Sequence, residues 1–543
     1  MVFARRSTTL LAAIIASCAM VLSLTACTSD NKTVVDGQTT VTSNSAGGVA
    51  VFTPSDGITL NQQMPLNKWA KLVPDLTKAL VDAGFKKGDI DHTTSDSLDK
   101  QSRAIQDFVV DHLSNNTTDD SGIAIAPDNM TLLVAPVVEA DASTRQYGDY
   151  VSQNLSTNDV TDGEATSDGE SSEDDSSKDD SSNTESDSTA SDEQAQAVDR
   201  LVSSLKLAKE SGMHVVLLGN SIEGYKPDAF VKFSDAQTIG KLQAEKMVSK
   251  LKLDKASKDN PKYIEVLLPY TAVDEKGNAN DSTFAQEAFR GIWQVLGSYY
   301  QKGVVESPSG TLDGKSTEND WQAVAYDAAK EGSTAKVLDK RLAKTDGQST
   351  LTRIDGIITM NDYIASEVVK ELDDLGYTGS AADINPQITI SGIVGNITGK
   401  KDLSRDAVPD PIKSPENDNA NDSSSSDDDA DKDTSASDKD RDSQWPLVTG
   451  YGAYVSNIPS IVNGKQWMTG MEDRQTIATD IAQACAKLNK DEALNSMPSI
   501  RNSEVGGVKK IPTISEPLLA VSASNLKSAL IDPGYISLAD AGL

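Results

Sequence analysis

Short, wholly apolar segments recur along this chain, and most are followed by a segment with helical periodicity. We interpret as buried strands residues 49–52, 131–135, 214–218, 263–268, 354–360 and 387–394. The helical segments are 69–85, 105–113, 198–211, 284–300, 321–329 and 364–375. Strands that are apolar throughout and alternate with helices are typical of parallel sheets covered on both faces. The sequence therefore predicts an α/β fold.

The size of the folded body predicts two lobes. Without its N-terminal segment and two acidic stretches the chain keeps roughly 430 of its 543 residues, more than one core usually supports. We expect two doubly wound parallel-sheet lobes joined by a hinge. Ligands of such sheets bind outside the carboxyl ends of the strands. A cleft between the two lobes is therefore the expected binding site.

Most of the net charge of −32 lies in two stretches. Residues 161–196 carry −12 and residues 416–442 carry −8. Because these Ser/Asp/Glu-rich stretches cannot bury enough apolar surface to offset the entropy of ordering, we interpret 156–196 and 414–443 as disordered surface loops. Calcium capture by the Asp runs is an alternative, but the D-x-[DN]-x-[DN]-G…E spacing is absent. The acidic balance argues against nucleic acid as a partner, since phosphate binding requires a basic surface.

The N-terminus has the features of an export signal. In residues 1–26, Arg5 and Arg6 precede an apolar run from Leu10 to Leu24. The run ends in Leu-Thr-Ala-Cys at 24–27, which resembles the lipobox of bacterial lipoproteins and implies acylation of Cys27. An ordinary signal peptide with a chance cysteine is the alternative. Residues 27–48 are predicted to be a flexible tether that holds the body at the extracytoplasmic face of the cell membrane.

No pattern of residues indicates catalysis, a metal or a cofactor. The three histidines, His92, His112 and His214, are widely separated, and we interpret each as a surface or strand-end residue. The nucleophile-elbow, Walker A and dinucleotide-binding motifs are absent. With Cys27 acylated, Cys485 is the remaining thiol of the mature chain, and its Ala- and Leu-rich helical surroundings predict a buried structural residue. We therefore expect a protein that is not an enzyme.

Four stretches of sequence carry a family resemblance. They are 510–536, with Glu516-Pro517 and Asp532-Pro533-Gly534-Tyr535; 461–474, with Gly464-Lys465-Gln466 and Met468-Thr469; 230–244, with Phe233-Ser234-Asp235; and 354–362, with Asn361-Asp362. Together they resemble the type I periplasmic binding proteins, specifically the xylose and multiple-sugar-binding receptors of ABC importers. The resemblance extends from about residue 49 to the C-terminus.

This resemblance implies capture of a small polar ligand between lobes that close about a hinge. Lobe 1 would comprise 49–229 and about 467–515, and lobe 2 would comprise 230–466 and about 516–543. The implied partners are a monosaccharide or short oligosaccharide, the permease subunits of an ABC importer, and the membrane through the lipid anchor. We expect the protein to act as a monomer.

The resemblance also implies a set of ligand contacts. These are Lys68, Trp69, Trp321, Asn361, Asp362 and either Asn280 or Asp281; Asn220 and Asn396 are added as candidate contacts at positions that depart from the family pattern. Trp321 matches an aromatic residue that stacks on the sugar ring, and Asn361 matches a polar contact at a strand end. Lys68 replaces an arginine of the family, which keeps the charge but loses the bidentate fork.

Other positions depart from the family pattern. Leu218-Gly219-Asn220 replaces the family's Tyr-Asp-Arg, residues 392–395 lack its Asp, and Glu472 or Asp473 replaces its Lys. Because each lost partner leaves a buried sugar hydroxyl unpaired, either the ligand differs or Asn220, Ser221 and Asn396 have taken over.

Several of these residues also have a purely structural interpretation. Trp69 could be core, Lys68 a solvated helix residue and Asp362 only a helix cap, and Trp293 and Trp467 are interpreted as packing residues. The function expected is that of an extracytoplasmic solute-binding lipoprotein. The alternative is a binding-protein fold that has lost sugar binding and serves in surface interaction, adhesion or sensing.

Overall fold

The computed structural model describes residues 32–35, 38–41, 46–55, 65–115, 125–138, 142–157, 185–273, 281–328, 330–343, 351–381 and 444–543. The chain divides into two units, Met1–Ser45 and Ala46–Leu543. The first contains an antiparallel hairpin of β1 (Lys32–Val35) and β2 (Gln38–Val41). The tether predicted over 27–48 thus includes strand structure. Its β-branched residues and the Asp-Gly sequence at 36–37 are together a hairpin signal.

The second unit contains a seven-stranded sheet. Its strands, in spatial order, are β17 (Ile500–Val505), β18 (Val508–Ser515), β9 (Ala229–Lys232), β7 (His214–Leu218), β5 (Met130–Val134), β3 (Gly48–Pro54) and β4 (Ile90–Ser95). Every neighbouring pair is parallel except β17 with β18. We call this sheet and its helices lobe 1.

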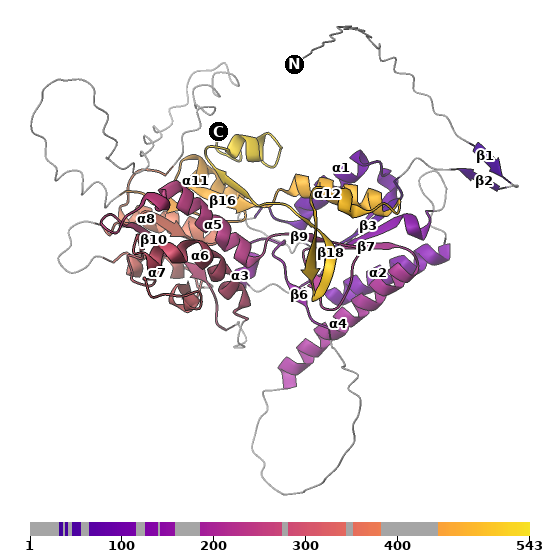
Figure 1. The fold of residues 1–543 in the computed structure, drawn as a ribbon, viewed down its shortest axis with the longest axis horizontal. Coiled ribbons are helices and arrows are strands. Elements are labelled where there is room, and N and C mark those ends of the chain that lie inside the picture. Colours follow the sequence, from indigo (N-terminus) through magenta and orange to yellow (C-terminus); the bar gives the residue numbers. More distant parts are fainter. Residues whose placement is uncertain are drawn as a thin grey trace, which may run out of the picture. The chain divides into compact units, whose positions relative to one another are not determined.

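Helices cover both faces of the lobe 1 sheet. Because successive side chains of a strand point to opposite faces, Val49 and Val51 pack in one apolar core and Ala50 and Phe52 in another. The first core lies under α1 (Trp69–Asp82) and α12 (Arg474–Leu488), the second under α2 (Leu98–Asn115) and α4 (Glu185–Glu210) (Figure 1). α4 begins inside the stretch 156–196 that was predicted to be a loop.

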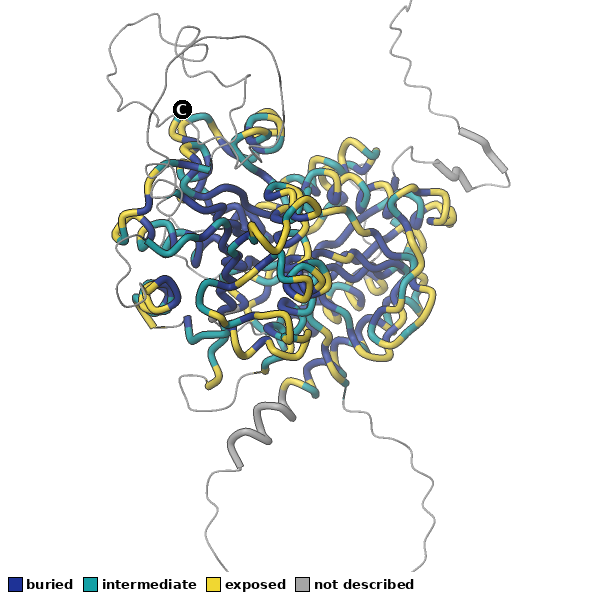
Figure 2. The backbone as a smooth tube through the Cα atoms, turned by 60° about the vertical axis from the view of Figure 1, so that its left-hand side comes forward, coloured by how far each residue is buried: buried dark blue, intermediate teal, exposed yellow. Residues whose placement is uncertain are grey.

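A second sheet, with its helices, forms lobe 2. It consists of the parallel strands β12 (Val305–Glu306), β10 (Lys262–Val266), β14 (Gly356–Ile358) and β15 (Leu447–Val448). The strands β11 (Leu268–Pro269) and β13 (Ala325–Tyr326) form a separate parallel pair. Helices α5 (Ala236–Leu251) and α6 (Thr283–Gln301) share the core of one face, and α7 (Ser333–Arg341) and α8 (Asp362–Leu375) that of the other. The predicted doubly wound α/β fold is confirmed, and the central strands of both sheets are buried in the interior (Figure 2).

The chain crosses between the lobes at three places. The crossings are the β9–α5 connection, the connection from β16 (Met468–Met471) to α12, and the connection from β18 to β19 (Leu519–Ser522). β16 and β19 pair antiparallel. Near them lies a small apolar core that includes Leu66, α11 (Ile458–Val462) and the π-helix Lys527–Ile531.

The remaining elements are short. They are α3 (Ala142–Arg145), β6 (Asn154–Leu155), β8 (Ser221–Ile222) and the 3-10 helices Lys87–Asp89, Pro127–Asn129, Leu253–Lys255, Asp320–Ala323, Val455–Asn457 and Leu494–Ser496. Within the described part of the chain, no helix combines the length and apolar character that crossing a membrane would require.

Some sequence predictions need correction. The helix predicted at 321–329 is a single 3-10 turn, Asp320–Ala323, followed by β13, because Ala325 and Tyr326 pair with β11. His112 is not a surface residue: it is buried in α2, with its ring 5.9 Å from that of Phe108. The strand predicted at 387–394 lies outside the described residues, and so do residues 392–395. The strand that pairs with β14 on this side of the sheet is β15. Cys485, Trp293 and Trp467 are buried, as predicted.

Candidate functional site

The connection between β5 and α4 contains a stretch that contacts residues of both lobes. We call residues 146–153 the bridging segment. Connections between neighbouring elements of a sheet and its covering helices usually have about 2–6 residues, whereas residues 135–184 separate β5 from α4 and include the short elements α3 and β6. The bridging segment is therefore not needed merely to join β5 to α4.

On the lobe 1 side, the bridging segment pairs with the start of α1. The Lys68 ammonium lies 2.7 Å from an Asp149 carboxylate oxygen, and the Trp69 amide donates to the other carboxylate oxygen at 3.1 Å. The Trp69 ring is 3% exposed and packs edge-on against Tyr150 and Phe233, at centroid distances of 5.0 and 5.7 Å. Trp69 is therefore a core residue, and Lys68 is paired within the chain.

Asn220, after β7, is also held by this part of the chain. Its side-chain oxygen accepts from the Gln153 amide at 2.9 Å, and its side-chain nitrogen donates to the Pro136 carbonyl at 2.9 Å. The Ser221 amide donates to the Gln153 carbonyl at 3.0 Å. Asn220 is buried, so its polar atoms hold Pro136 and Gln153 in position next to the end of β7.

On the lobe 2 side, the bridging segment contacts the end of β14. Asn361 caps α8 by accepting from the Ile364 amide at 2.9 Å, and its side-chain nitrogen donates to the Gln146 side-chain oxygen at 3.1 Å. The Tyr454 hydroxyl donates to the Gln146 carbonyl at 2.8 Å. On sequence grounds Asp362 could have been the helix cap; the residue that caps α8 is its neighbour Asn361.

Two tyrosines of the bridging segment enter different cores. The Tyr147 ring is fully buried, 4.7 Å from the ring of Phe284 and 6.3 Å from that of Tyr451, and belongs to the core under α5 and α6. Tyr150 belongs to the core under α1 and α12, where it stacks on Phe233 at 4.8 Å. A stretch of four residues thus contributes an aromatic side chain to each lobe.

Asp362 is buried in a polar network rather than aimed at the bridging segment. Its carboxylate accepts from the Tyr454 amide at 2.9 Å, the Gln466 side chain at 2.7 Å and the Thr469 hydroxyl at 2.9 Å. Burial raises the pKa of Asp362 to about 6, although these hydrogen bonds act in the opposite direction. These contacts make Asp362 a structural acid that joins α8 to β16.

The other predicted site residues have separate surroundings. Trp321 is 8% exposed and lies edge-on to Tyr270, at a centroid distance of 5.1 Å. Asp281 is exposed and accepts from the Thr283 amide and hydroxyl at the start of α6, at 2.9 and 2.7 Å. Asn280, Asn396 and Cys27 lie outside the described residues.

Sequence reasoning missed the bridging segment itself. Its signal was an aromatic-rich stretch, Gln-Tyr-Gly-Asp-Tyr at 146–150, next to a long acidic run. It also missed the role of Glu472, which is 1% exposed and accepts from the Ser234 amide at 2.6 Å. Burial raises the pKa of Glu472 to about 7. A carboxylate directly after the buried strand Met468–Met471 was the available signal.

No protein-family model and no curated protein matches the sequence. Solved structures that are similar include an ABC transporter solute-binding protein from Clostridium phytofermentans with bound β-D-glucose, at 17% identity and a TM-score of 0.44, covering 91% of this chain and 99% of that one. Another is a carbohydrate transporter solute-binding protein from Chloroflexus aurantiacus in complex with D-glucose, at 17% identity and a TM-score of 0.44, covering 92% and 98%. Because the sequence identities and TM-scores are this low, the function has to be argued from the chain's own residues.

Taken together, three of the predicted ligand residues converge on one stretch of the chain. Lys68, Asn220 and Asn361 follow β3, β7 and β14, and each contacts residues 146–153. The carboxyl ends of parallel strands are where doubly wound sheets place their ligands. We call the place where these three residues meet the bridging segment the junction. It holds a cation, two side-chain amides and buried aromatic rings, which are kinds of group that bind small polar ligands once they are freed from their partners in the chain.

Proposed function

We propose that this chain is an extracytoplasmic solute-binding protein that captures a sugar or related small polar ligand between its lobes. The observation that carries the proposal is the convergence of Lys68, Asn220 and Asn361, from the carboxyl ends of strands in two sheets, on a single polar stretch. Side chains placed this way can reach a ligand from both lobes. Closure of the lobes would then be stabilised by contacts made from each side.

The setting of this function follows from the sequence resemblance. An acylated Cys27 would anchor the protein to the outer side of the cell membrane, and an ABC permease would receive the ligand. Cys27→Ser should move the protein from the membrane fraction to the medium, and the wild-type N-terminal peptide should carry the mass of a lipid. An unmodified Cys27 in the mature wild-type protein would contradict the anchor.

Calorimetric titration of the purified protein with pentoses, hexoses and short oligosaccharides tests the ligand class. We expect a heat of binding from at least one sugar, with weaker binding in Lys68→Ala and Asn361→Ala. Lys100→Ala is a matched control, because Lys100 is exposed on α2 and pairs with Asp96 in the neighbouring turn. The absence of binding by every sugar would contradict a sugar ligand.

A second candidate function is favoured by the pairing of the same side chains within the chain. Lys68 pairs with Asp149, and both polar ends of Asn220 are hydrogen-bonded. A binding-protein fold whose site is filled by its own chain would serve as a surface interaction, adhesion or sensory protein. Mass spectrometry of the native protein separates the two: a co-purifying small molecule supports solute capture, and its absence together with failed titrations supports the second function.

A further inference from the structure

We propose that the bridging segment, residues 146–153, clamps lobe 1 to lobe 2 in the absence of a ligand, and that a ligand enters the junction only after the segment leaves lobe 2. The clamp is inferred only from contacts between the bridging segment and the two lobes. The entry step rests on the proposed function, since it concerns the same site.

The clamp contacts both lobes. Its lobe 2 end consists of the adjacent residues Gln146 and Tyr147, with hydrogen bonds to Asn361 and Tyr454 and ring contact with Phe284. Val151 of the same segment is also buried in the core under α5 and α6. Ring pairs of this kind contribute about 0.5–1.5 kcal/mol beyond their buried area. These contacts hold one part of the segment in lobe 2.

The lobe 1 end is broader. Asp149 forms an ion pair with Lys68, and its backbone amide donates a hydrogen bond to the Asn67 carbonyl at 2.8 Å. The Tyr150 ring packs against the ring of Trp69. The Ser152 amide donates to the Ser234 carbonyl at 3.2 Å. Because the lobe 1 contacts include the Asp149 ion pair, we expect separation of the lobes to break first the hydrogen bonds of Gln146 and the ring contact of Tyr147.

Gly148 sits between the two ends and fits only as glycine. Its φ is +97°, and a Cβ atom there would lie 2.5 Å from the Asn67 carbonyl oxygen. Side chains larger than hydrogen are therefore excluded by both conformation and space. This tight turn lets Tyr147 and Tyr150 enter different cores from one short stretch.

The bridging segment occupies the junction, so a ligand can enter only after the segment leaves it. Gln146 already uses the side-chain nitrogen of Asn361, and Asp149 already uses the Lys68 ammonium. A sugar hydroxyl that bound either group would have to replace a contact of the segment. The chain therefore competes with the ligand for the same polar groups.

The clamp can be tested by distance measurement without any ligand. Spin labels at Lys206→Cys on α4 and Lys246→Cys on α5 lie on exposed positions of lobe 1 and lobe 2, while buried Cys485 is shielded from the label. Double electron–electron resonance on the unliganded mature protein, in which Cys485 is the remaining native thiol, should give one narrow distance. Gln146→Ala with Tyr147→Ala should broaden the distribution toward longer distances.

Tyr225→Ala is the matched control, since Tyr225 is a buried tyrosine of the lobe 1 core under α2 and α4. Its distribution should match that of the wild type. Gln146→Ala alone is the milder variant if the double variant folds poorly, and it should broaden the distribution less. A broad wild-type distribution without ligand, or unchanged distances in the Gln146 and Tyr147 variants, would overturn the clamp.

Sugar titration then separates the clamp from the proposed function. If the double variant binds a sugar at least tenfold more tightly than the wild type, entry by displacement is supported. Equal affinity and equal association rates in both proteins would overturn the entry step while leaving the clamp. If no protein binds sugar but the variants still open, the proposed function fails and the clamp stands.

Discussion

The Ser234 amide donates a hydrogen bond of 2.6 Å to the buried carboxylate of Glu472. Ser234 lies in the β9–α5 crossing between the lobes, and Glu472 lies in the β16–α12 crossing. The Tyr451 hydroxyl, after β15, contacts both Ser234 and Glu472. Two of the three crossings are therefore joined through one acid that is out of contact with water.

Glu472→Gln should stabilise the protein at alkaline pH. Burial raises the pKa of Glu472 from 4.5 to about 7, so the folded state holds a proton that the unfolded state has lost between those values. Stability from this group therefore falls as pH rises from 4.5 to 7 and stays low above 7. Glutamine can still accept from Ser234, so at pH 8 the gain should be on the order of 3 kcal/mol, at ~1.4 kcal/mol per pKa unit.

Urea unfolding of the wild type and Glu472→Gln at pH 5 and pH 8 measures this effect. The difference in the free energy of unfolding should be small at pH 5 and large at pH 8. Glu245→Gln, on the exposed side of α5, should show no comparable change. A difference that is the same at both pH values would contradict the assignment of the pH dependence to Glu472.

Asp362→Asn should be destabilising, in contrast to the change at Glu472. The two Asp362 oxygens accept from three donors, the Tyr454 amide, the Gln466 side chain and the Thr469 hydroxyl. Asparagine replaces one acceptor oxygen by a donor, which leaves at least one buried donor unpaired at a cost of about 1–3 kcal/mol. Thermal unfolding should show a lower midpoint at pH 8 for Asp362→Asn than for Asp281→Asn, which changes an exposed helix-start acid. Equal midpoints for the two variants would contradict this network.

The sequence predicted the strands β3, β5, β7, β10 and β14, but not the other strands of the two sheets or the contacts of the bridging segment. Strands such as 214–218 and 131–135 could be predicted because they are wholly apolar and bounded by helical periodicity. The two-residue strand β15 could not, since Leu447 and Val448 are too few to show a period. They become a strand only by pairing with β14.

The candidate site illustrates the same limit at the level of side chains. Asn220 and Asn361 were placed directly after strands and Lys68 at the start of the first helix, as the structure has them, because such element ends follow from local pattern. Their actual partners, Asp149, Gln153 and Gln146, come from residues 67 to 215 positions away in the chain. Such contacts depend on how a long connection folds back, and no local periodicity encodes that path.

Gly240→Ala should destabilise lobe 2, although alanine normally favours a helix over glycine by about 0.5–1 kcal/mol. Gly240 lies where α5 crosses α6, and a Cβ atom there would stand 2.2 Å from the Ala288 carbonyl oxygen. The helices would have to separate to accept the methyl group, and overpacking of this kind costs about 1–3 kcal/mol. Ser249→Ala, at an exposed position of the same helix, should change the free energy of urea unfolding by less than about 0.5 kcal/mol. A more stable Gly240→Ala protein would show that α5 and α6 do not approach this closely.

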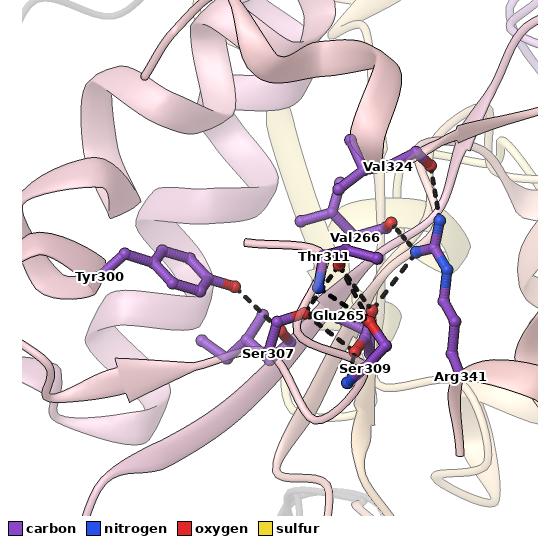
Figure 3. Close-up of polar contacts among 9 residues, drawn as sticks. Glu265, Val266, Tyr300, Ser307, Ser309, Thr311, Val324 and Arg341 are labelled. Carbon is purple, nitrogen blue, oxygen red and sulfur yellow. Dashed lines mark hydrogen bonds and ion pairs between the residues drawn. The ribbon is translucent and has the colours of Figure 1, made fainter. Parts of the chain in front are cut away.

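A buried ion pair holds α7 to β10 in lobe 2 (Figure 3). Glu265 accepts from the Ser307 hydroxyl at 2.9 Å and the Ser309 amide at 2.8 Å, and its other oxygen lies 3.3 Å from the Arg341 guanidinium. Arg341 also donates to the Val324 carbonyl at 2.9 Å. Both charged groups are therefore buried and hydrogen-bonded to protein groups instead of water.

Arg341→Met should cost about 3–5 kcal/mol in the free energy of unfolding, because it leaves the Glu265 carboxylate buried without its counter-charge. Adding Glu265→Gln should recover part of that loss, since the second change removes the uncompensated charge; the two changes should therefore be non-additive in urea unfolding. Asp99→Asn is the matched control, because Asp99 pairs with Arg103 and Arg200 at the surface, where such pairs contribute at most about 1 kcal/mol. If the effects of Arg341→Met and Glu265→Gln simply add, the two side chains do not act as a pair, and α7 is held to the sheet by its apolar contacts alone.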